Sequence, residues 1–428
     1  MGSLDDQLAN LRQRIALIDA KYADAIPMVR PTRVRIEEWA DGRVVENEFG
    51  PHYQLDKVFA GHKPHGSADV GALSEMPDTL LGVLSDNEIS GVAPERWAFL
   101  DTETTGLAGG SGTYPFLIGV GRITRTGFVV RQFFMREYAE ERSQLAALEA
   151  HLEEFDVLIT YNGKSYDQPL LETRYRMNRA RPPFTRMRHL DLLHGARRLW
   201  KLRLESCKLI QLEQQILGVN REGDLPGHMI PYVYFEYLRD QEATRLVPIF
   251  HHNAIDILTL ACLTAIVPAA FQNNQMVKHG AELAGIGRWL QNSGDQEQAL
   301  DVLRRSVDAG LPDRLLFRAL WDIAALEKKL GRPQAGLQLL RELAECRNEF
   351  QGCALEELAK YFEHKEPNIP LALEFTRKAL SLDSTEALLR RRDRLERKAA
   401  KKTLFLSSSG RAEVALPAGV AGTILPSQ

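Results

Sequence analysis

Cysteine is scarce in this chain of 428 residues, and the cysteines that it has form no closely spaced pair. They stand alone at Cys207, Cys262, Cys346 and Cys353. Without a C-x-x-C pair, the sequence argues against a thiolate zinc site and against a disulfide framework, and it fits a reducing cytosol. We therefore expect a cytoplasmic protein.

The chain also has little net charge and no long uninterrupted apolar run. Its formal net charge of −3 indicates no particular class of partner. The longest apolar candidate, residues 255–271, begins beside Asp256 and contains Pro268, and the first residues show no basic segment followed by an apolar one. We expect neither a membrane span nor a secretory signal.

Apolar patterning divides the chain into segments. We assign residues 1–94 to an N-terminal extension that starts with a helix over 4–22. Residues 95–275 open with three short strands, a helix and a fourth strand, and then become mainly helical. This order predicts an α/β core, a mixed sheet flanked by helices. The expected strands are 97–100, 115–121, 127–134 and 157–161, and the expected helices are 139–155, 167–180, 189–200, 205–217, 231–240 and 254–265.

Residues 276–400 are helical in pattern and repetitive. Triplets of similar residues recur at spacings of 37 and 36, each after a helix and a turn, and begin at Gln298, Ala335 and Leu371. Helix–turn–helix units of this period resemble tetratricopeptide-type repeats, which stack to bury a shared core. We expect an all-α repeat domain that docks a protein partner or extends a substrate track, followed by a disordered tail over 401–428.

Four acidic residues stand at the ends of predicted core elements. Asp101 and Glu103 close the first strand, where residues two apart point to the same side. Asp167 follows the fourth strand and the turn N-G-K, and Asp256 opens an apolar helix. A hard divalent ion needs several carboxylates that converge from different elements, and these four acids provide them.

Each acid alone also has a simpler explanation. A lone D-x-E is most often a solvated surface pair, and an aspartate after Asn-Gly usually caps a helix. Asp256 is harder to explain in this way, because an apolar helix face rarely carries an unpaired charge. The four acids together, in this order and on these elements, predict a metal site more strongly than any one of them.

Three motifs carry these acids: F-L-D-T-E-T-T-G-L, T-Y-N-G-K-S-Y-D-Q-P-L-L and H-H-N-A-I-D-I-L. They resemble the exonuclease motifs of the DEDD (DnaQ-like) 3′–5′ exonuclease superfamily, and most of all its YprB-like subgroup with a ribonuclease H-like domain. The similarity covers roughly residues 95–270. The resemblance implies that Asp101, Glu103, Asp167 and Asp256 bind two Mg²⁺ or Mn²⁺ ions, one activating the attacking water and the other stabilising the leaving 3′ oxygen.

The general base lies between two neighbouring histidines. The superfamily uses a histidine five residues before the last aspartate or a tyrosine four residues before it, and this chain has His251 and His252 at those places. Either imidazole can take a proton from water near neutral pH. Within a helix, an offset of four keeps His252 on the face of Asp256, whereas an offset of five does not bring His251 there. We therefore favour His252 over His251.

Substrate contacts are expected at two places. The resemblance implies that Asn162 and the loop from Thr104 to Leu107 touch the terminal nucleotide, although both also fit ordinary turn chemistry. Residues 174–208 hold nine arginines and two lysines against two acids, a net charge of +9. We interpret this segment, with Arg176 and Arg179, as a track for nucleic-acid phosphates rather than a solvated helix face.

The sequence therefore predicts a metal-dependent 3′–5′ exonuclease that acts on DNA or RNA. One rival is a non-catalytic protein that binds nucleic acid, or serves as a scaffold, on a nuclease-like core; the presence of all four acids weighs against it. The other rival is a structure-specific endonuclease, which would use the same metal chemistry. An enzyme specific for RNA would need to read the 2′-hydroxyl, and no residue is identified for that contact.

Overall fold

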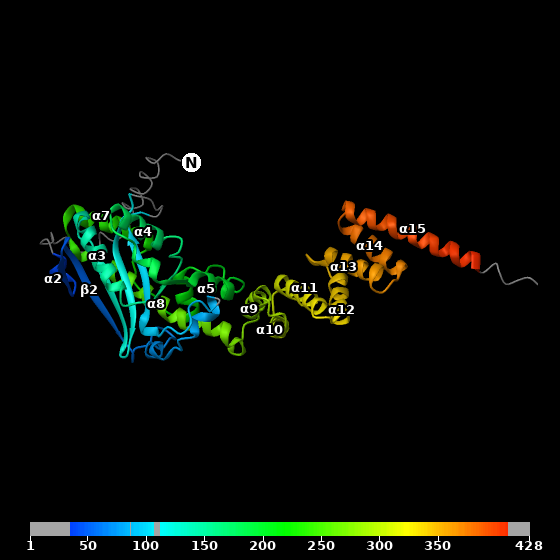
Figure 1. The fold of residues 1–428 in the computed structure, drawn as a ribbon, viewed down its shortest axis with the longest axis horizontal. Helices are drawn as coiled ribbons and strands as arrows, with labels where there is room; N and C mark the ends of the chain where they lie inside the picture. The colour runs from blue at the N-terminus through cyan, green and yellow to red at the C-terminus, as the bar shows by residue number, and fades with distance from the viewer. Residues whose placement is uncertain (1–34, 86, 107–111, 410–428) are drawn as a thin grey trace, which may run out of the picture. The chain divides into compact units, whose positions relative to one another are not determined.

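The structure, a computed structural model, describes residues 35–85, 87–106 and 112–409 (Figure 1). The helix predicted over 4–22 lies outside these residues, as do residues 410–428 of the predicted tail. The start of that tail is part of helix α15, Glu386–Ser409. Two compact units divide the chain, the first formed by 1–192 and 209–265 and the second by 193–208 and 266–428.

One mixed sheet of seven strands forms the centre of the first unit, in the order β1-β2-β5-β4-β3-β6-β7. The first five strands in this order, β1, β2, β5, β4 and β3, pair antiparallel with their neighbours. Strand β6 runs parallel to both β3 and β7. The strands are Gly42–Asn47 (β1), Gly50–Ala60 (β2), Trp97–Thr104 (β3), Pro115–Thr124 (β4), Gly127–Phe134 (β5), Val157–Thr160 (β6) and Arg188–Asp191 (β7).

The predicted mixed sheet flanked by helices is confirmed, and the sheet is larger than expected. Strands β3 to β6 match the four predicted strands. Strands β1 and β2 come from the segment assigned to an N-terminal extension, and residues 53–60 of β2 pair with β5. The start of the helix predicted over 189–200 is instead strand β7, because its backbone pairs with residues 157–160 of β6. Such tertiary pairing overrides local propensity.

Helices cover both faces of the sheet (Figure 1). Helices α3 and α4 pack Leu148 and Tyr175 into the core on one face. Helices α7 and α8 pack Tyr234 and Phe250 into the core on the other. The helices up to residue 272 are Ile36–Trp39 (α2), Glu141–Leu152 (α3), Asp167–Met177 (α4), Leu192–Trp200 (α5), Leu209–Leu212 (α6), Ile230–Asp240 (α7) and Val247–Gln272 (α8).

Glycines of β4 allow α8 to lie close to the sheet. A Cβ atom on Gly119 would stand 2.2 Å from Asn253 Oδ1 and 2.4 Å from Ile257 Cδ1. A Cβ atom on Gly121 would stand 2.5 Å from Ile257 Cγ2. Contacts this short do not occur between real side chains, so the helix can approach only because both positions are glycine.

The stretch 243–272, which includes α8, is also long and apolar enough to cross a membrane by length and composition alone. In the structure, 67% of its most apolar window is buried. The core helix of a soluble protein meets the same criteria, so this finding is weak evidence for a membrane span.

The second unit contains successive helix pairs. The triplets at Gln298, Ala335 and Leu371 occupy the same register, beginning at the third residue of α10, α12 and α14. The middle residue of each triplet is small and buried, and Gly336 lies so close to the Ala324 carbonyl of α11 that an added Cβ atom would stand 2.9 Å from its oxygen. The helices are Gly280–Ser293 (α9), Gln296–Asp308 (α10), Asp313–Lys329 (α11), Pro333–Glu345 (α12), Gln351–His364 (α13), Ile369–Leu382 (α14) and α15.

Replacing Gly119 with alanine should disturb the contact between α8 and the sheet. We expect Gly119→Ala to lower the free energy of unfolding by about 1–3 kcal/mol, the usual effect of overpacking a core. Urea denaturation followed by tryptophan fluorescence measures the change. Gly227→Ala is the matched control, because no described atom lies within 4 Å of the added Cβ atom. Equal stability of both variants would contradict the close packing.

Candidate active site

Strand β3 carries the first two acids out of the core. Its first four residues are buried, and its last four, from Asp101 to Thr104, are partly exposed. The change occurs because polar residues replace apolar ones where the strand leaves the covered part of the sheet. Asp101 and Glu103 are two residues apart on this strand, as the sequence predicted, and so project from the same side.

Asp101 is held by helix α8 through a buried amide. The Asn253 side chain donates to Asp101 Oδ2 at 2.9 Å and also lies 3.3 Å from the Asp101 carbonyl oxygen. The Oδ1 atom of Asn253 accepts a hydrogen bond from Gln132 of β5 at 2.8 Å, and Gln132 also donates to the Phe250 carbonyl. This chain of amides fixes α8 against β3 and orients the Asp101 carboxylate.

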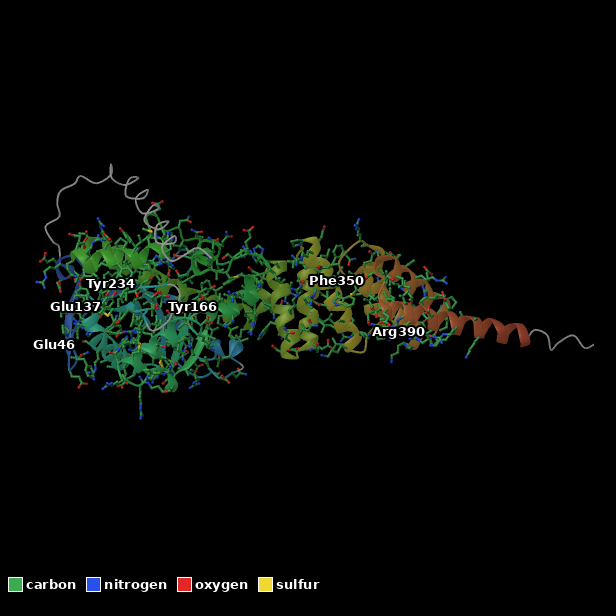
Figure 2. All side chains as sticks on the ribbon, turned by 90° about the horizontal axis from the view of Figure 1, so that it is seen from above. Glu46, Glu137, Tyr166, Tyr234, Phe350 and Arg390 are labelled. Carbon is green, nitrogen blue, oxygen red and sulfur yellow. The ribbon has the colours of Figure 1, made fainter. Side chains whose placement is uncertain are left out.

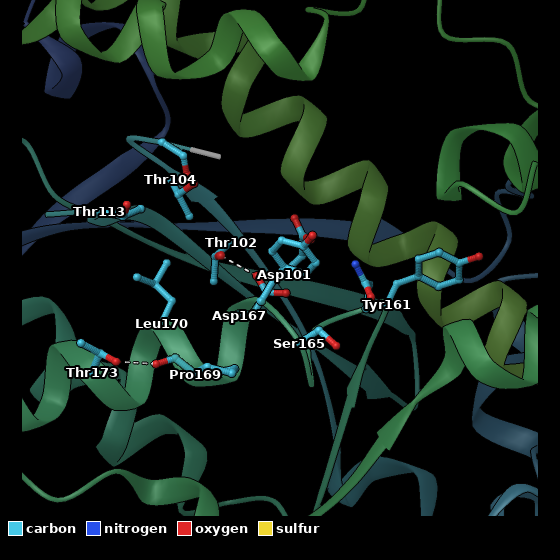
Figure 3. Close-up of a pocket in the computed structure, with 13 residues that line it drawn as sticks. Asp101, Thr102, Thr104, Thr113, Tyr161, Ser165, Asp167, Pro169, Leu170 and Thr173 are labelled. Carbon is cyan, nitrogen blue, oxygen red and sulfur yellow. Dashed lines mark hydrogen bonds between the residues drawn. The ribbon is translucent and has the colours of Figure 1, made fainter. Parts of the chain in front are cut away.

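Asp167 is the first residue of α4 and faces the same strand. Thr102 donates its hydroxyl to Asp167 Oδ1 (Figure 3). Asp191 of β7 holds the loop before Asp167. Its carboxylate accepts hydrogen bonds from the backbone N–H groups of Asn162, at 2.8 Å, and Lys164, at 3.2 Å. Asn162 has a positive φ of 69°, a conformation that asparagine tolerates better than most residues.

Asp256 and His252 lie one turn apart on α8 and face each other. His252 Nε2 is 3.6 Å from Asp256 Oδ2. On its other side, His252 Nδ1 lies 2.9 and 3.0 Å from the two oxygens of Asp224. His251, by contrast, is exposed. The offset of four therefore places His252, and not its neighbour, beside the last acid.

Arg221 also enters the site. Its Nη2 atom lies 2.5 Å from Asp256 Oδ1 and 2.5 Å from Glu213 Oε2, and its Nη1 atom lies 3.3 Å from Asp224 Oδ2. The Arg221 side chain is only 7% exposed, and Glu213 is fully buried. This guanidinium thus links the last acid to two further acids.

Burial raises the pKa of three of the acids, and the charges of neighbouring acids add to the shift. Burial, followed by the charges of Asp256 and Asp167, raises the pKa of Asp101 well above its usual value. Burial and the charge of Asp101 likewise raise the pKa of Glu103. Burial raises the pKa of Asp167 to about 6, although the Thr102 hydroxyl opposes this shift. Three elements distant in sequence therefore bring like charges together where water solvates them poorly.

A divalent cation fits this donor set chemically. Oxygen atoms of several carboxylates are the ligands that Mg²⁺ and Mn²⁺ prefer, and a cation would relieve the repulsion that raises the pKa values. Among the described residues, however, no three His, Cys, Asp or Glu side chains are already arranged as a coordinating group. Instead, Asn253, Thr102 and Arg221 each hold one of the acids by a hydrogen bond.

A cleft of about 450 Å³ opens beside Asp101 and Asp167 (Figure 3). Its walls combine carboxylates, hydroxyls and apolar groups, and its size suits a nucleotide-sized ligand. Tyr166, directly before Asp167, is 60% exposed at the surface of the first unit (Figure 2). The lining residues are Asp101, Thr102, Thr104, Gly106, Thr113, Tyr161, Asn162, Ser165, Tyr166, Asp167, Pro169, Leu170 and Thr173.

Known proteins share this core. Residues 98–267 match the RNase_H_2 family of the RNase_H superfamily. "Uncharacterized protein YprB" of Bacillus subtilis (strain 168) is 34% identical over 288 residues, which cover 66% of this chain and 68% of YprB. The chain belongs to the RNase_H superfamily. The ribonuclease H-like fold expected from the sequence is therefore confirmed, and with it a nuclease-type domain that binds nucleic acid.

Some of the predicted substrate contacts of this ribonuclease H-like domain line the cleft, and others lie on the exposed surface. Thr104 and Asn162 line the cleft, and the Thr104 hydroxyl donates to the Gly106 carbonyl. Leu107 lies outside the described residues. Arg176 and Arg179 are exposed, and Arg176 pairs with Glu172 at 2.8 Å within α4.

Other residues of the basic segment are buried in the core of the ribonuclease H-like domain. Arg174 is buried and forms an ion pair with Glu141, with its guanidinium 3.8 Å from the centre of the Tyr114 ring. Tyr175 and Phe184, which interleave the arginines in the sequence, are buried in the same core and are not available to stack on bases.

Sequence reasoning missed the roles of Asn253, Arg221 and Asp224. The sequence could have indicated the role of Asn253, because a polar residue one turn before Asp256 on an apolar helix needs a hydrogen-bond partner when it is buried. Arg221 and Asp224 follow a π-helical turn, Glu213–Leu217, in a segment with Gly and Pro but no periodicity. Nothing in their local pattern distinguishes them from surface residues.

Removing one of the mutually repelling charges should stabilise the metal-free domain. Because the pKa of Asp101 is raised on folding, its ionisation opposes folding, and the penalty grows as pH rises from the unfolded pKa to the folded one. At pH 8, with a chelator present, we expect Asp101→Asn to gain about 1 kcal/mol, a typical single-residue effect. Near pH 4 the gain should vanish. Thermal melts at both pH values measure it, and a loss of stability at pH 8 would contradict the repulsion.

Proposed function

We propose that this protein is a metal-dependent 3′–5′ exonuclease in which Asp101, Glu103, Asp167 and Asp256 bind two Mg²⁺ or Mn²⁺ ions. The observation that carries the proposal is the convergence of acids from β3, α4 and α8, where Asn253, Thr102 and Arg221 hold Asp101, Asp167 and Asp256. When bound, divalent ions supply positive charge for the attacking water and for the leaving oxygen of a phosphodiester. The family match supports a nuclease more broadly.

His252 is the proposed general base. The Asp224 carboxylate accepts a hydrogen bond from the Nδ1–H group of His252. The Nε2 atom then carries no proton and can take one from water. Nε2 faces Asp256 at 3.6 Å and therefore points to the place where the acids converge. A base needs this reach and orientation before its basicity matters.

The cleft beside Asp167 is the proposed site for the terminal nucleotide. Thr104 and Asn162 lie on its wall, and the exposed ring of Tyr166 offers a face for a base. Exposed Arg176 and Arg179, on and just after α4, would contact phosphates further along the strand. These contacts are independent of base identity, so we expect little sequence preference.

The second unit is the proposed docking region for a protein partner. Its paired helices place the three triplets in one register, as expected for tetratricopeptide-like repeats. The scattered cysteines of the sequence support our proposal of a cytoplasmic location.

Metal-dependent cleavage tests the proposal directly. Purified protein with Mn²⁺ should shorten end-labelled DNA or RNA one nucleotide at a time from the 3′ end. Asp101→Ala and Asp256→Asn should abolish this ladder while both variants stay folded. Asp301→Asn, which changes an acid of α10 that is 64% exposed, is the matched control and should cleave normally. Internal cuts would indicate an endonuclease, and a bound but uncut probe would indicate a binding module.

The two histidines provide a second test. His252→Ala should lower the cleavage rate by roughly 10²–10⁴, the usual contribution of a positioned base. His251→Ala changes the neighbouring residue, whose side chain is exposed, and should have a much smaller effect. Single-turnover cleavage at saturating Mn²⁺ compares them. The reverse ranking would move the role to His251.

A further inference from the structure

Arg221 contacts Asp256, a carboxylate that the proposed function assigns to metal binding. Its Nη2 atom is 2.5 Å from Asp256 Oδ1, and His252 Nε2 faces the other oxygen, Oδ2, at 3.6 Å. Both oxygens of Asp256 are therefore turned towards nitrogen groups of the protein. A guanidinium and a divalent ion cannot use the same carboxylate lone pair at the same time.

The guanidinium has a second set of partners that does not involve Asp256. Arg221 Nε is 3.0 Å from Glu213 Oε1, and Nη1 is 3.3 Å from Asp224 Oδ2. Glu213 is fully buried, and its Oε1 atom also lies 3.7 Å from His65 Nε2. If Arg221 releases Asp256, it keeps these two acids and is not left as an unpaired buried charge.

We propose that Arg221 is a built-in counter-cation that holds Asp256 in the metal-free protein and gives up Oδ1 when a divalent ion binds. Glu213 and Asp224 retain the guanidinium nearby, so the exchange needs only a local movement. The contact would thus set a threshold of metal concentration for occupancy at Asp256. This inference rests on the proposed function, because it assumes that Asp256 is a metal ligand.

Mn²⁺ binding without nucleic acid tests the exchange. Electron paramagnetic resonance counts free Mn²⁺ during titration of the intact wild-type chain, Arg221→Gln and Arg221→Lys. We expect Arg221→Gln to tighten the weakest site by about tenfold, the effect of removing one competing charge-assisted hydrogen bond. Arg221→Lys keeps the charge but loses the forked geometry, so it should fall between the two.

Two further variants isolate the contact. Arg131→Gln is the matched control, because Arg131 of β5 forms a similar paired contact with Asp56 of β2, at 2.8 Å, between partly exposed side chains. It should leave Mn²⁺ affinity unchanged. In an Asp256→Asn background, Arg221→Gln should no longer tighten Mn²⁺ binding, because the carboxylate over which the two cations compete is gone.

Stability without metal gives an independent reading. Arg221→Gln leaves Glu213 and Asp256 without their cation, so with a chelator it should melt at a lower temperature than wild type. Saturating Mn²⁺ should recover more stability in this variant than in wild type. If Arg221→Gln does not fold, Arg221→Lys carries the same comparison.

The outcomes separate the two proposals. Wild-type protein that binds no Mn²⁺ would overturn the metal site and with it the proposed function. Wild-type protein that binds Mn²⁺, with equal or weaker binding by Arg221→Gln, would overturn only the counter-cation. Unchanged Mn²⁺ binding together with weaker binding of a labelled oligonucleotide would instead make Arg221 a contact for substrate phosphate.

Discussion

The candidate active site depends on one electrostatic constraint, the burial of several carboxylates close enough to repel one another. Asp101, Asp167 and Asp256 come from three elements that are far apart in the sequence, and packing of the sheet and helices forces them together. Each is held by a different donor: an amide, a hydroxyl and a guanidinium. These donors allow the charges to coexist in a folded domain before any cation arrives.

The same constraint explains the packing around α8. The helix must come close enough to β3 for Asn253 to reach Asp101, and the glycines of β4 remove the side chains that would keep it away. Gln132, on β5, then holds Asn253 from the far side. An amide pair serves here better than an apolar contact, because a hydrogen bond fixes both the distance and the orientation of the carboxylate.

The sequence predicted features that contradict their local pattern, such as D-x-E ending an apolar strand and Asp256 on an apolar helix. It did not predict features that depend on distant partners. Strand β2 joins the sheet by pairing with β5, and β1 joins it by pairing with β2, and neither pairing was predicted from the sequence of this segment. The sequence analysis included Arg174 in the basic segment. In the structure, Arg174 is buried and donates a hydrogen bond to Glu141, 33 residues away. Composition records a charge but not its partner.

In one branch of the exonuclease superfamily that the motifs resemble, a tyrosine stands four residues before the last acid. This chain has His252 at that place, and the contacts of its imidazole give Asp224 a physical role. A phenol carries one polar atom, whereas an imidazole carries two, and its second nitrogen needs an acceptor before the first can act as a base. Asp224 provides that acceptor at 2.9 Å. It lies three residues after Arg221, so one loop contacts both His252 and Asp256. The contacts of the histidine at this position therefore depend on this loop as well as on helix α8.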